Sequence, residues 1–308
     1  MGTYVLRRIL QMIPVFIGAT LLIFLMVYTL PGDPIAALFG DKAADPAQVA
    51  QLRHLYYLDQ PLWKQYLHYM WNLLQGNFGT SFTGRSVAAL MGDAFPVTIR
   101  LALVAFAFEI FVGIPLGLLS GLKRGSLLDT LVLIGTLIVI SIPVFVLANV
   151  AQQVVGVNLG WVTPTVQNSN DISQLILPGL VLGSLSLAFV TRLTRTSIGE
   201  NRRADYMRTA VAKGLPQRTV ISRHLLRNSL IPVVTFLGTD LGALMGGAIV
   251  TEGIFNVKGV GNLLYQAIRH KEGPTVVGVV TVLVIVYLVA SLVVDLLYAV
   301  LDPRIRYA

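Results

Sequence analysis

The sequence has no cysteine and few charged residues. Among its 308 residues, 12% are Asp, Glu, Lys or Arg, whereas soluble domains carry about 25%. The absence of cysteine excludes disulfides, thiolate zinc ligands and a cysteine nucleophile. The scarcity of charge, together with 55% hydrophobic residues, excludes an intrinsically disordered chain. These two features indicate a membrane protein.

Patterns that would carry enzymatic chemistry are also missing. No G-x-x-x-x-G-K-[ST] sequence, which would cradle the phosphates of a nucleotide, occurs in the chain. The histidines lie outside the long apolar stretches and lack the i, i+4 spacing of a helical metal pair: His54, His68, His224 and His270. We therefore expect no catalytic residue, no metal site and no cofactor in this chain.

Six apolar stretches are long enough to cross a bilayer core, which takes about 20 helical residues. We place them at Ile9–Leu30, Val97–Gly121, Asp129–Val155, Gln174–Thr191, Ser229–Thr251 and Thr275–Leu301. The predicted fold class is an all-α membrane protein with six transmembrane helices. The first stretch is longer than the roughly 7–15 residues of a secretory signal core. It ends in a Pro-Gly-Asp-Pro turn at 31–34, so we expect it to stay as a membrane helix.

Lys and Arg are unevenly divided between the two sets of loops that six spans create. The set that contains both termini holds 15 of them, and the opposite set holds seven. Because cytoplasmic loops carry the excess of Lys and Arg, we expect both termini in the cytoplasm. The net charge of +8 then reflects this division and not a nucleic-acid-binding surface.

Two loops are large enough to carry function, and they suggest a division into residues 1–95 and 96–308. The outer loop, 31–95, contains a segment rich in Trp and Tyr at 61–74 that predicts a helix. Such rings favour the interface between lipid and water, so we expect this helix to lie on the bilayer, although a binding role stays open. The inner loop, 192–228, holds nine of the 23 basic residues.

Four ionisable residues lie within or at the margins of the predicted spans: Arg100, Glu109, Asp240 and Asp295. A charge at the bilayer centre costs about 3 kcal/mol on insertion scales, so such residues usually face a bundle interior or water. Glu109 and Asp240 lie deepest, which makes them candidates for a translocation pathway. The alternative is that each forms a hydrogen bond to a neighbouring helix, and the sequence leaves both possibilities open.

Glycines at four-residue spacing accompany both deep acids. One set follows Glu109 and the other surrounds Asp240: Gly113, Gly117 and Gly121, and Gly238, Gly242 and Gly246. Small residues at this spacing let the backbone of another helix approach closely. We therefore expect helix-packing contacts along both sets.

The inner loop has two helical segments separated by Gly-Leu-Pro at 214–216. A short helix from Ala204 to Lys213 is expected to stop at Gly214, because glycine adopts the left-handed conformation that ends many helices. A second helix is expected to start at Pro216, which suits a first turn. A helix–Gly–helix segment of this kind can dock in a cleft of a soluble partner. The alternative is a basic loop that only fixes the topology.

This inner loop resembles the "EAA" loop of binding-protein-dependent ABC importer permeases, in its dipeptide/oligopeptide form. That form reads approximately D-Y-x-R-T-A-x-A-K-G-L and then R-H-x-L-R-N-x-L-x-P. The matching residues here are Asp205, Tyr206, Arg208, Thr209, Ala210, Ala212, Lys213, Gly214 and Leu215, then Arg223, His224, Leu226, Arg227, Asn228, Leu230 and Pro232. The glutamate that names the general motif is absent, and Arg208 stands about where it would fall.

The resemblance extends over nearly the whole chain. It includes the segments 31–34, 58–61, 76–81, 251–255, 259–261, 295–298 and 301–304. Three departures affect the outer region: Asn77 stands where Asp is usual, Tyr57 where Gly is common, and residues 270–274 where an Asp-Tyr-Pro-like stretch is frequent. These departures leave the contacts with an outer partner open.

The resemblance implies a permease subunit in a prokaryotic plasma (inner) membrane that imports di- or oligopeptides. Its implied partners are a second, homologous permease, two ABC ATPase subunits that hold ATP and Mg, and an extracytoplasmic solute-binding protein. The ATPases would receive the inner loop, with the small Ala210 and Gly214 fitting a cleft and Tyr206, Arg208 and Lys213 adding contacts.

Other functions fit the sequence less well. Nickel, glutathione or another small solute is the alternative within the same family, although no His- or Met-rich pathway is visible. From another class, a secondary transporter or channel would suit the deep acids, but the inner loop would then have no role.

Overall fold

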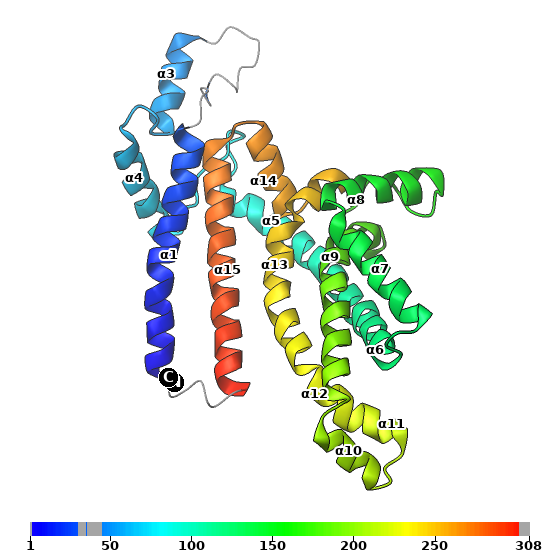
Figure 1. The fold of residues 1–308 in the computed structure, drawn as a ribbon. Helices are drawn as coiled ribbons and strands as arrows, with labels where there is room; N and C mark the ends of the chain where they lie inside the picture. Colours follow the sequence, from blue (N-terminus) through cyan, green and yellow to red (C-terminus); the bar gives the residue numbers. More distant parts are fainter. Residues whose placement is uncertain (1, 30–34, 36–44, 302–308) are drawn as a thin grey trace. The chain divides into compact units, whose positions relative to one another are not determined.

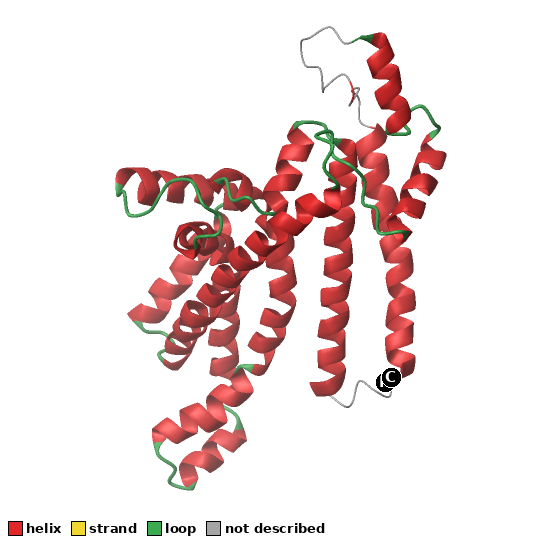
Figure 2. Ribbon diagram, turned by 180° about the vertical axis from the view of Figure 1, so that it is seen from behind, coloured by secondary structure: helices red, strands yellow, loops and turns green. Residues whose placement is uncertain are grey.

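The computed structural model describes residues 2–29, 35 and 45–301, and these residues form helices and loops without a strand (Figure 2). The predicted turn at 31–34 and residues 302–308 lie outside the described part, as does the side chain of Asp295. The chain divides into two compact units, Met1–Val97 with Lys258–Ala308, and Thr98–Val257. The all-α class is therefore confirmed for the described residues.

The described residues contain four helices that are long and apolar enough to cross a membrane: Val5–Thr29, Val87–Leu122, Ile172–Asn201 and Gly273–Leu292. Two further pairs of helices pass the same test together but are bent within each pair. The number of spans is thus four, or up to six if each bent pair counts as one. This agrees with the membrane class predicted from the sequence and leaves the exact number of crossings between four and six.

In the first unit, α1 (Gly2–Thr29) and α15 (Gly273–Leu301) pack side by side (Figure 1). The outer segment adds α3 (Pro46–Leu55) and α4 (Leu62–Leu74), and α14 (Val260–Arg269) precedes α15. Helix α4 is the aromatic helix predicted at 61–74, and Pro61 is its N-cap. Its Tyr69 hydroxyl donates to Thr281 Oγ1 on α15 at 2.6 Å, which ties α4 to a membrane helix.

In the second unit, α9 (Ile172–Asn201) lies against most of the other long helices. Helix α5 (Val87–Phe108) continues through a π-helical turn, η1 (Glu109–Gly113), directly into α6 (Ile114–Leu122). The first half of α5 belongs to the other unit. The elements that contact α9 include α5, η1, α6, α7 (Leu127–Ser141), α8 (Val144–Ala151), η3 (Val220–Leu226), α12 (Arg227–Ser229) and α13 (Ile231–Phe255).

The predicted third span, Asp129–Val155, is not one continuous helix. The chain bends by 106° between α7 and the segment Val144–Asn158, which comprises α8 and the π-helical η2 (Gln152–Asn158). Pro143 causes the break, because proline disfavours a helical conformation in the residue before it, and Ile142 is extended with φ −95° and ψ 125°. The 15 residues of α7 span about 22 Å, less than a bilayer core of about 30 Å.

Two other predicted boundaries also shift. Residues 192–201, assigned to the inner loop because of their charges, continue α9 as a helix to Asn201. Their inner face is buried, with Thr194, Ser197 and Ile198 at most 5% exposed, so packing extends the helix beyond its apolar stretch. The fifth span follows a bend of 47° before Ile231, where α13 begins with a proline in its first turn.

Glycines allow α6 to lie very close to α9. A Cβ atom added at Gly117 would stand 2.5 Å from the carbonyl oxygen of Thr191 and 2.6 Å from Thr194 Cβ. At Gly121 it would stand 2.8 Å from Ile198 Cβ, and at Gly113 it would stand 3.2 Å from a Val190 methyl group. The first glycine set therefore lies at the helix contact that its spacing indicates.

Two glycines of the second set, Gly238 and Gly246, have no such partner within the described part of this chain. An added Cβ at Gly238 or Gly246 on α13 would meet nothing within 4 Å. Gly238 and Gly246 thus present a narrow open surface on α13, in contrast with the tight contact along α6.

A buried ion pair that the sequence did not reveal joins α7 to α9. Arg195 Nε donates to Asp129 Oδ1 at 2.6 Å, and Arg195 Nη2 donates to Oδ2 at 2.8 Å. The Ser120 hydroxyl and the backbone N–H of Gly125 also donate to this carboxylate. The Arg195 side chain is 16% exposed and the Asp129 side chain is 4% exposed, so each charge is compensated mainly by the other.

We predict that Gly117→Ala destabilises the protein by about 1–3 kcal/mol, because a methyl group would be forced into the backbone of α9. The matched control is Gly135→Ala on α7, where nothing lies within 4 Å of an added Cβ. That control should be neutral or stabilise by about 0.5–1 kcal/mol through the helix preference of alanine. Thermal unfolding in detergent measures both, and equal shifts for the two variants would contradict the close packing.

We also predict that Asp129→Leu costs about 3–5 kcal/mol, because it leaves the Arg195 guanidinium buried without its partner. Adding Arg195→Leu should restore most of the lost stability, since replacing both members of a buried pair by apolar groups is often nearly neutral. Denaturation of the single and double variants tests this coupling. A double variant as unstable as Asp129→Leu alone would show that the pair is not the cause.

Candidate functional site

The inner loop folds as a helical hairpin beyond the end of α9 (Figure 1). Its first helix, α10 (Asp205–Ala212), ends at Lys213, and Gly214 follows with a positive φ of 73°. Pro216 then caps α11 (Gln217–Thr219), which continues into the π-helical η3 (Val220–Leu226). The predicted helix–Gly–helix pattern is thus confirmed, with the glycine at the turn.

The hairpin has a hydrophobic core that includes the end of α9. Met207 and Ala210 of α10 pack with Val220 and Leu225 of η3 and with Ile198 of α9. Ala210 was expected to fit a partner's cleft, but its side chain is only 4% exposed. It lies three residues after Met207, which places both on the same face of the helix. Its small size therefore suits the packing of α10 against η3 within this chain.

The outward face of the hairpin is polar and basic. The remaining residues of the predicted set are all exposed: Asp205, Tyr206, Arg208, Thr209, Lys213 and Gly214. The Arg208 side chain is 81% exposed and lies 3.9 Å from the Asp205 carboxylate, an exposed pair that contributes little to stability. These side chains are available to a partner, and the hairpin that carries them is fixed to α9.

The two deep acids meet in the second unit. Glu109 opens the π-helical turn η1 and is fully buried, and its carboxyl group faces that of the partly buried Asp240 on α13. The Ser186 hydroxyl of α9 donates to Asp240 Oδ1 at 3.1 Å. Among the described residues no donor group reaches either Glu109 oxygen. Because carboxylates only accept, their contact is a hydrogen bond only when one of them is protonated.

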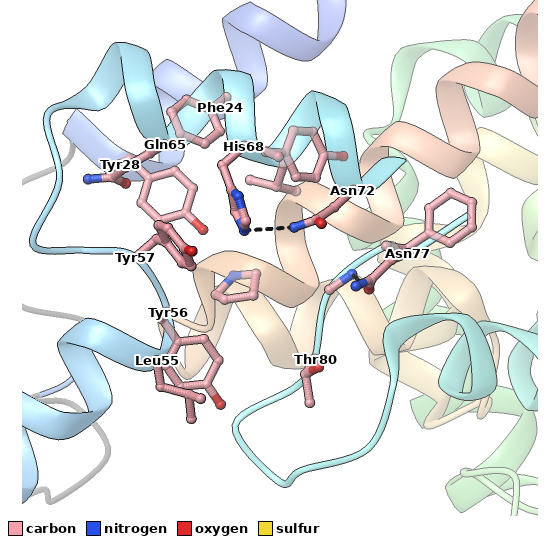
Figure 3. Close-up of a pocket in the computed structure, with 15 residues that line it drawn as sticks. Phe24, Tyr28, Leu55, Tyr56, Tyr57, Gln65, His68, Asn72, Asn77 and Thr80 are labelled. Carbon is pink, nitrogen blue, oxygen red and sulfur yellow. Dashed lines mark hydrogen bonds between the residues drawn. The ribbon is translucent and has the colours of Figure 1, made fainter. Parts of the chain in front are cut away.

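A pocket in the first unit was not predicted from the sequence (Figure 3). It has a volume of about 410 Å³ and is lined by side chains of α1, α4, the turn after α3, the segment 77–80 and the start of α15. None of the lining residues is Asp, Glu, Lys or Arg. Burial raises the pKa of Tyr69 to about 12 against the opposing effect of its hydrogen bond to Thr281, so this ring also stays neutral near pH 7.

Tyr57 stands out in the wall of this pocket because its φ is +58°. The left-handed conformation costs a residue with a side chain about 1–2 kcal/mol. Its ring stacks on the imidazole of His68, with centroids 3.9 Å apart and planes inclined by 18°. His68 Nε2 is in turn hydrogen-bonded to Asn72 Nδ2 at 2.9 Å. The only sequence signal was a tyrosine at a position where glycine is common.

Comparison with known proteins covers the whole chain. Residues 113–307 match the model of the binding-protein-dependent transport system inner membrane component family, and residues 1–102 match the model of its N-terminal part. The dipeptide transport system permease protein of Escherichia coli (strain K12) is 37% identical, over 99% of this chain and 98% of its own length. The corresponding dipeptide permease of Alkalihalophilus pseudofirmus is 36% identical over 100% of both chains.

A third relative differs in its solute. The glutathione transport system permease protein of Salmonella typhimurium (strain LT2) is 38% identical over 100% of both chains. All three relatives are permease proteins of transport systems, and the family models account for both the outer segment and the helical hairpin. The chain therefore belongs to the family of binding-protein-dependent transport system inner membrane components.

Proposed function

We propose that this chain is the membrane-spanning permease subunit of an ATP-driven importer for di- and oligopeptides. The observation that carries the proposal is the helical hairpin at residues 205–226, which presents exposed side chains to a partner while its core is built on the end of α9. The full-length similarity to dipeptide permeases supports the same conclusion. A secondary transporter or channel would leave the hairpin without a role.

The proposed partners follow from the same surface. Two ABC ATPase subunits hold ATP and Mg, and one of them receives α10 in a groove, a common mode of helix recognition. Tyr206, Arg208, Lys213 and Gly214 supply the contacts, while Asp205 and Thr209 complete the exposed face. A second, homologous permease and an extracytoplasmic solute-binding protein complete the assembly.

The proposed orientation places both termini in the cytoplasm of a prokaryotic cell and the chain in its plasma (inner) membrane. The 15 Lys and Arg on the side of the termini, against seven on the other, support it because positive charge favours the cytoplasmic side. In this arrangement the two bent helix pairs each complete a span, which gives six.

We further propose that Asp240 faces the translocation pathway and that Glu109 supports it from behind. Asp240 is partly exposed, whereas Glu109 is fully buried. The open glycine surface beside Asp240 would bring a neighbouring helix of the second permease close to α13. The peptide's ammonium group would then pass a carboxylate at the centre of the complex.

Glutathione is the second candidate solute. The glutathione permease of Salmonella typhimurium supports this candidate, because its identity of 38% to this chain slightly exceeds the 36% and 37% of the two dipeptide permeases. Glutathione is itself a tripeptide, so both candidates share the peptide bond and the ammonium group. We propose that the separate binding protein selects the solute, so that the same permease architecture serves either one.

We predict that Gly214→Trp abolishes the stimulation of ATPase activity by the loaded binding protein in the complex reconstituted from this chain and its proposed partners. The bulky ring would keep α10 out of its groove, and the positive φ would strain the turn by about 1–2 kcal/mol. ATPase assays in proteoliposomes, with and without binding protein, measure the effect.

The matched control is Gly125→Trp, in the turn between α6 and α7. Gly125 also has a positive φ, 83°, and an added Cβ there meets nothing within 4 Å, as at Gly214. This variant should keep its stimulation because it carries the same strain outside the hairpin. Full stimulation in Gly214→Trp would refute the docking of α10.

We predict that Asp240→Asn lowers ATP-driven uptake of a labelled dipeptide roughly tenfold, the loss expected for one charge-assisted contact. Asp93→Asn is the control, because its carboxylate is 73% exposed and pairs with Arg85 at the surface. Uptake by cells that lack the chain and are complemented with each variant gives the comparison. Equal uptake for both variants would contradict a role of Asp240 in the pathway and would indicate that it serves packing.

A further inference from the structure

The strained Tyr57 and its pocket have no role in the function proposed above. Residues without a side-chain penalty, chiefly glycine, are favoured at a positive φ. This chain has tyrosine there, and its ring forms part of the pocket wall (Figure 3). Backbone strain of this kind persists where surrounding contacts hold it, and it gathers at ligand clamps.

The surrounding contacts are present. The stack on His68 fixes one face of the Tyr57 ring, and the bond from His68 to Asn72 fixes the imidazole. The tyrosine nevertheless remains 44% exposed. The ring is thus held in position by α4 while part of its surface stays accessible.

The chemistry of the pocket selects its occupant. Its volume of about 410 Å³ lies within the range of ligand sites, about 300–1,000 Å³. Without Asp, Glu, Lys or Arg in its wall, it offers no ion-pair partner of these types to the ammonium and carboxylate of a free dipeptide, and an unpaired charge is costly to desolvate. A lipid acyl chain would in turn leave the amides of Gln65, Asn72 and Asn77 facing hydrocarbon.

An internal segment of a folded protein fits these requirements. Its backbone amides match the side-chain amides, and one aromatic or aliphatic side chain can lie against Tyr57. The pocket lies where α1 ends and α15 begins (Figure 3). In the proposed orientation this is the extracytoplasmic end of both helices, where a solute-binding protein approaches.

We propose that this pocket receives an uncharged loop of the solute-binding protein, with Tyr57 as the ring that anchors it. The inference rests on the proposed function, since it requires a binding-protein-dependent importer. Aromatic rings in such pockets commonly dominate interface affinity. Tyr57 then contributes to the affinity of this permease for its binding protein.

The test measures binding of the purified, solute-loaded binding protein to the complete transporter in nanodiscs. Tyr57→Gly and Tyr57→Asn remove the ring but suit the left-handed backbone, and both should weaken binding about tenfold or more. Tyr57→Phe keeps the ring and should bind as the wild type does. Trp71→Ala removes an exposed ring of α4 that does not line the pocket and should also leave the affinity unchanged.

The outcomes separate this inference from the proposed function. If the wild-type transporter neither binds the protein nor responds to it with ATPase activity, the proposed function fails. If the wild type binds and Tyr57→Gly and Tyr57→Asn bind equally well, the pocket inference alone is overturned. An equal loss in Trp71→Ala, or a lower unfolding temperature that accompanies the loss in both Tyr57 variants, would also overturn it.

Discussion

The close approach of α9 to its neighbours is the constraint on which the second unit depends. Within a lipid bilayer helices gain little from the hydrophobic effect, so they associate through tight packing and hydrogen bonds. Glycines remove the side chains that would separate the helices, at Gly117 and Gly121 toward α9 and at Gly183 of α9 toward the backbone of Ala105. The ion pair of Asp129 with Arg195 then fixes α7 to the same helix.

Helix α9 connects the helical hairpin to the carboxyl pair, which gives the proposed transport mechanism a mechanical link between the two sites. The core of the hairpin includes Ile198, so the hairpin and the end of α9 form one packed body. Farther along, α9 contacts η1 and α13, the elements that carry Glu109 and Asp240, and its Ser186 donates to Asp240. When an ATPase moves the hairpin in the proposed complex, the displacement reaches the carboxyl pair through a single helix. Packed interfaces of this kind shift between discrete arrangements.

The sequence predicted those features whose signals are local. Periodicity and helix-ending residues located α4 and α10, because Pro61 and Gly214 act within one helical turn. Depth in an apolar stretch identified Glu109 and Asp240, which the structure brings face to face. The apolar composition of residues 129–155 predicted one continuous span, because composition does not reveal the bend before Pro143.

Contacts between residues far apart in the chain could not be predicted from the sequence. Asp129 and Arg195 are 66 positions apart, and nothing in either neighbourhood indicates the other. The burial of Ala210 depends on η3 folding back over α10, and the pocket around Tyr57 requires five separate segments to meet. A tyrosine in place of a common glycine was visible in the sequence, but its positive φ was not.

The central claim is that this chain carries peptides across the membrane under the power of ATP. Its most direct test is uptake of a labelled dipeptide by cells that lack the chain and by complemented cells, with unlabelled peptides, glutathione and nickel as competitors. The account predicts that uptake depends on the chain and on ATP and that short peptides compete for it. Equal uptake without the chain, or competition by nickel but not by peptides, would contradict the account.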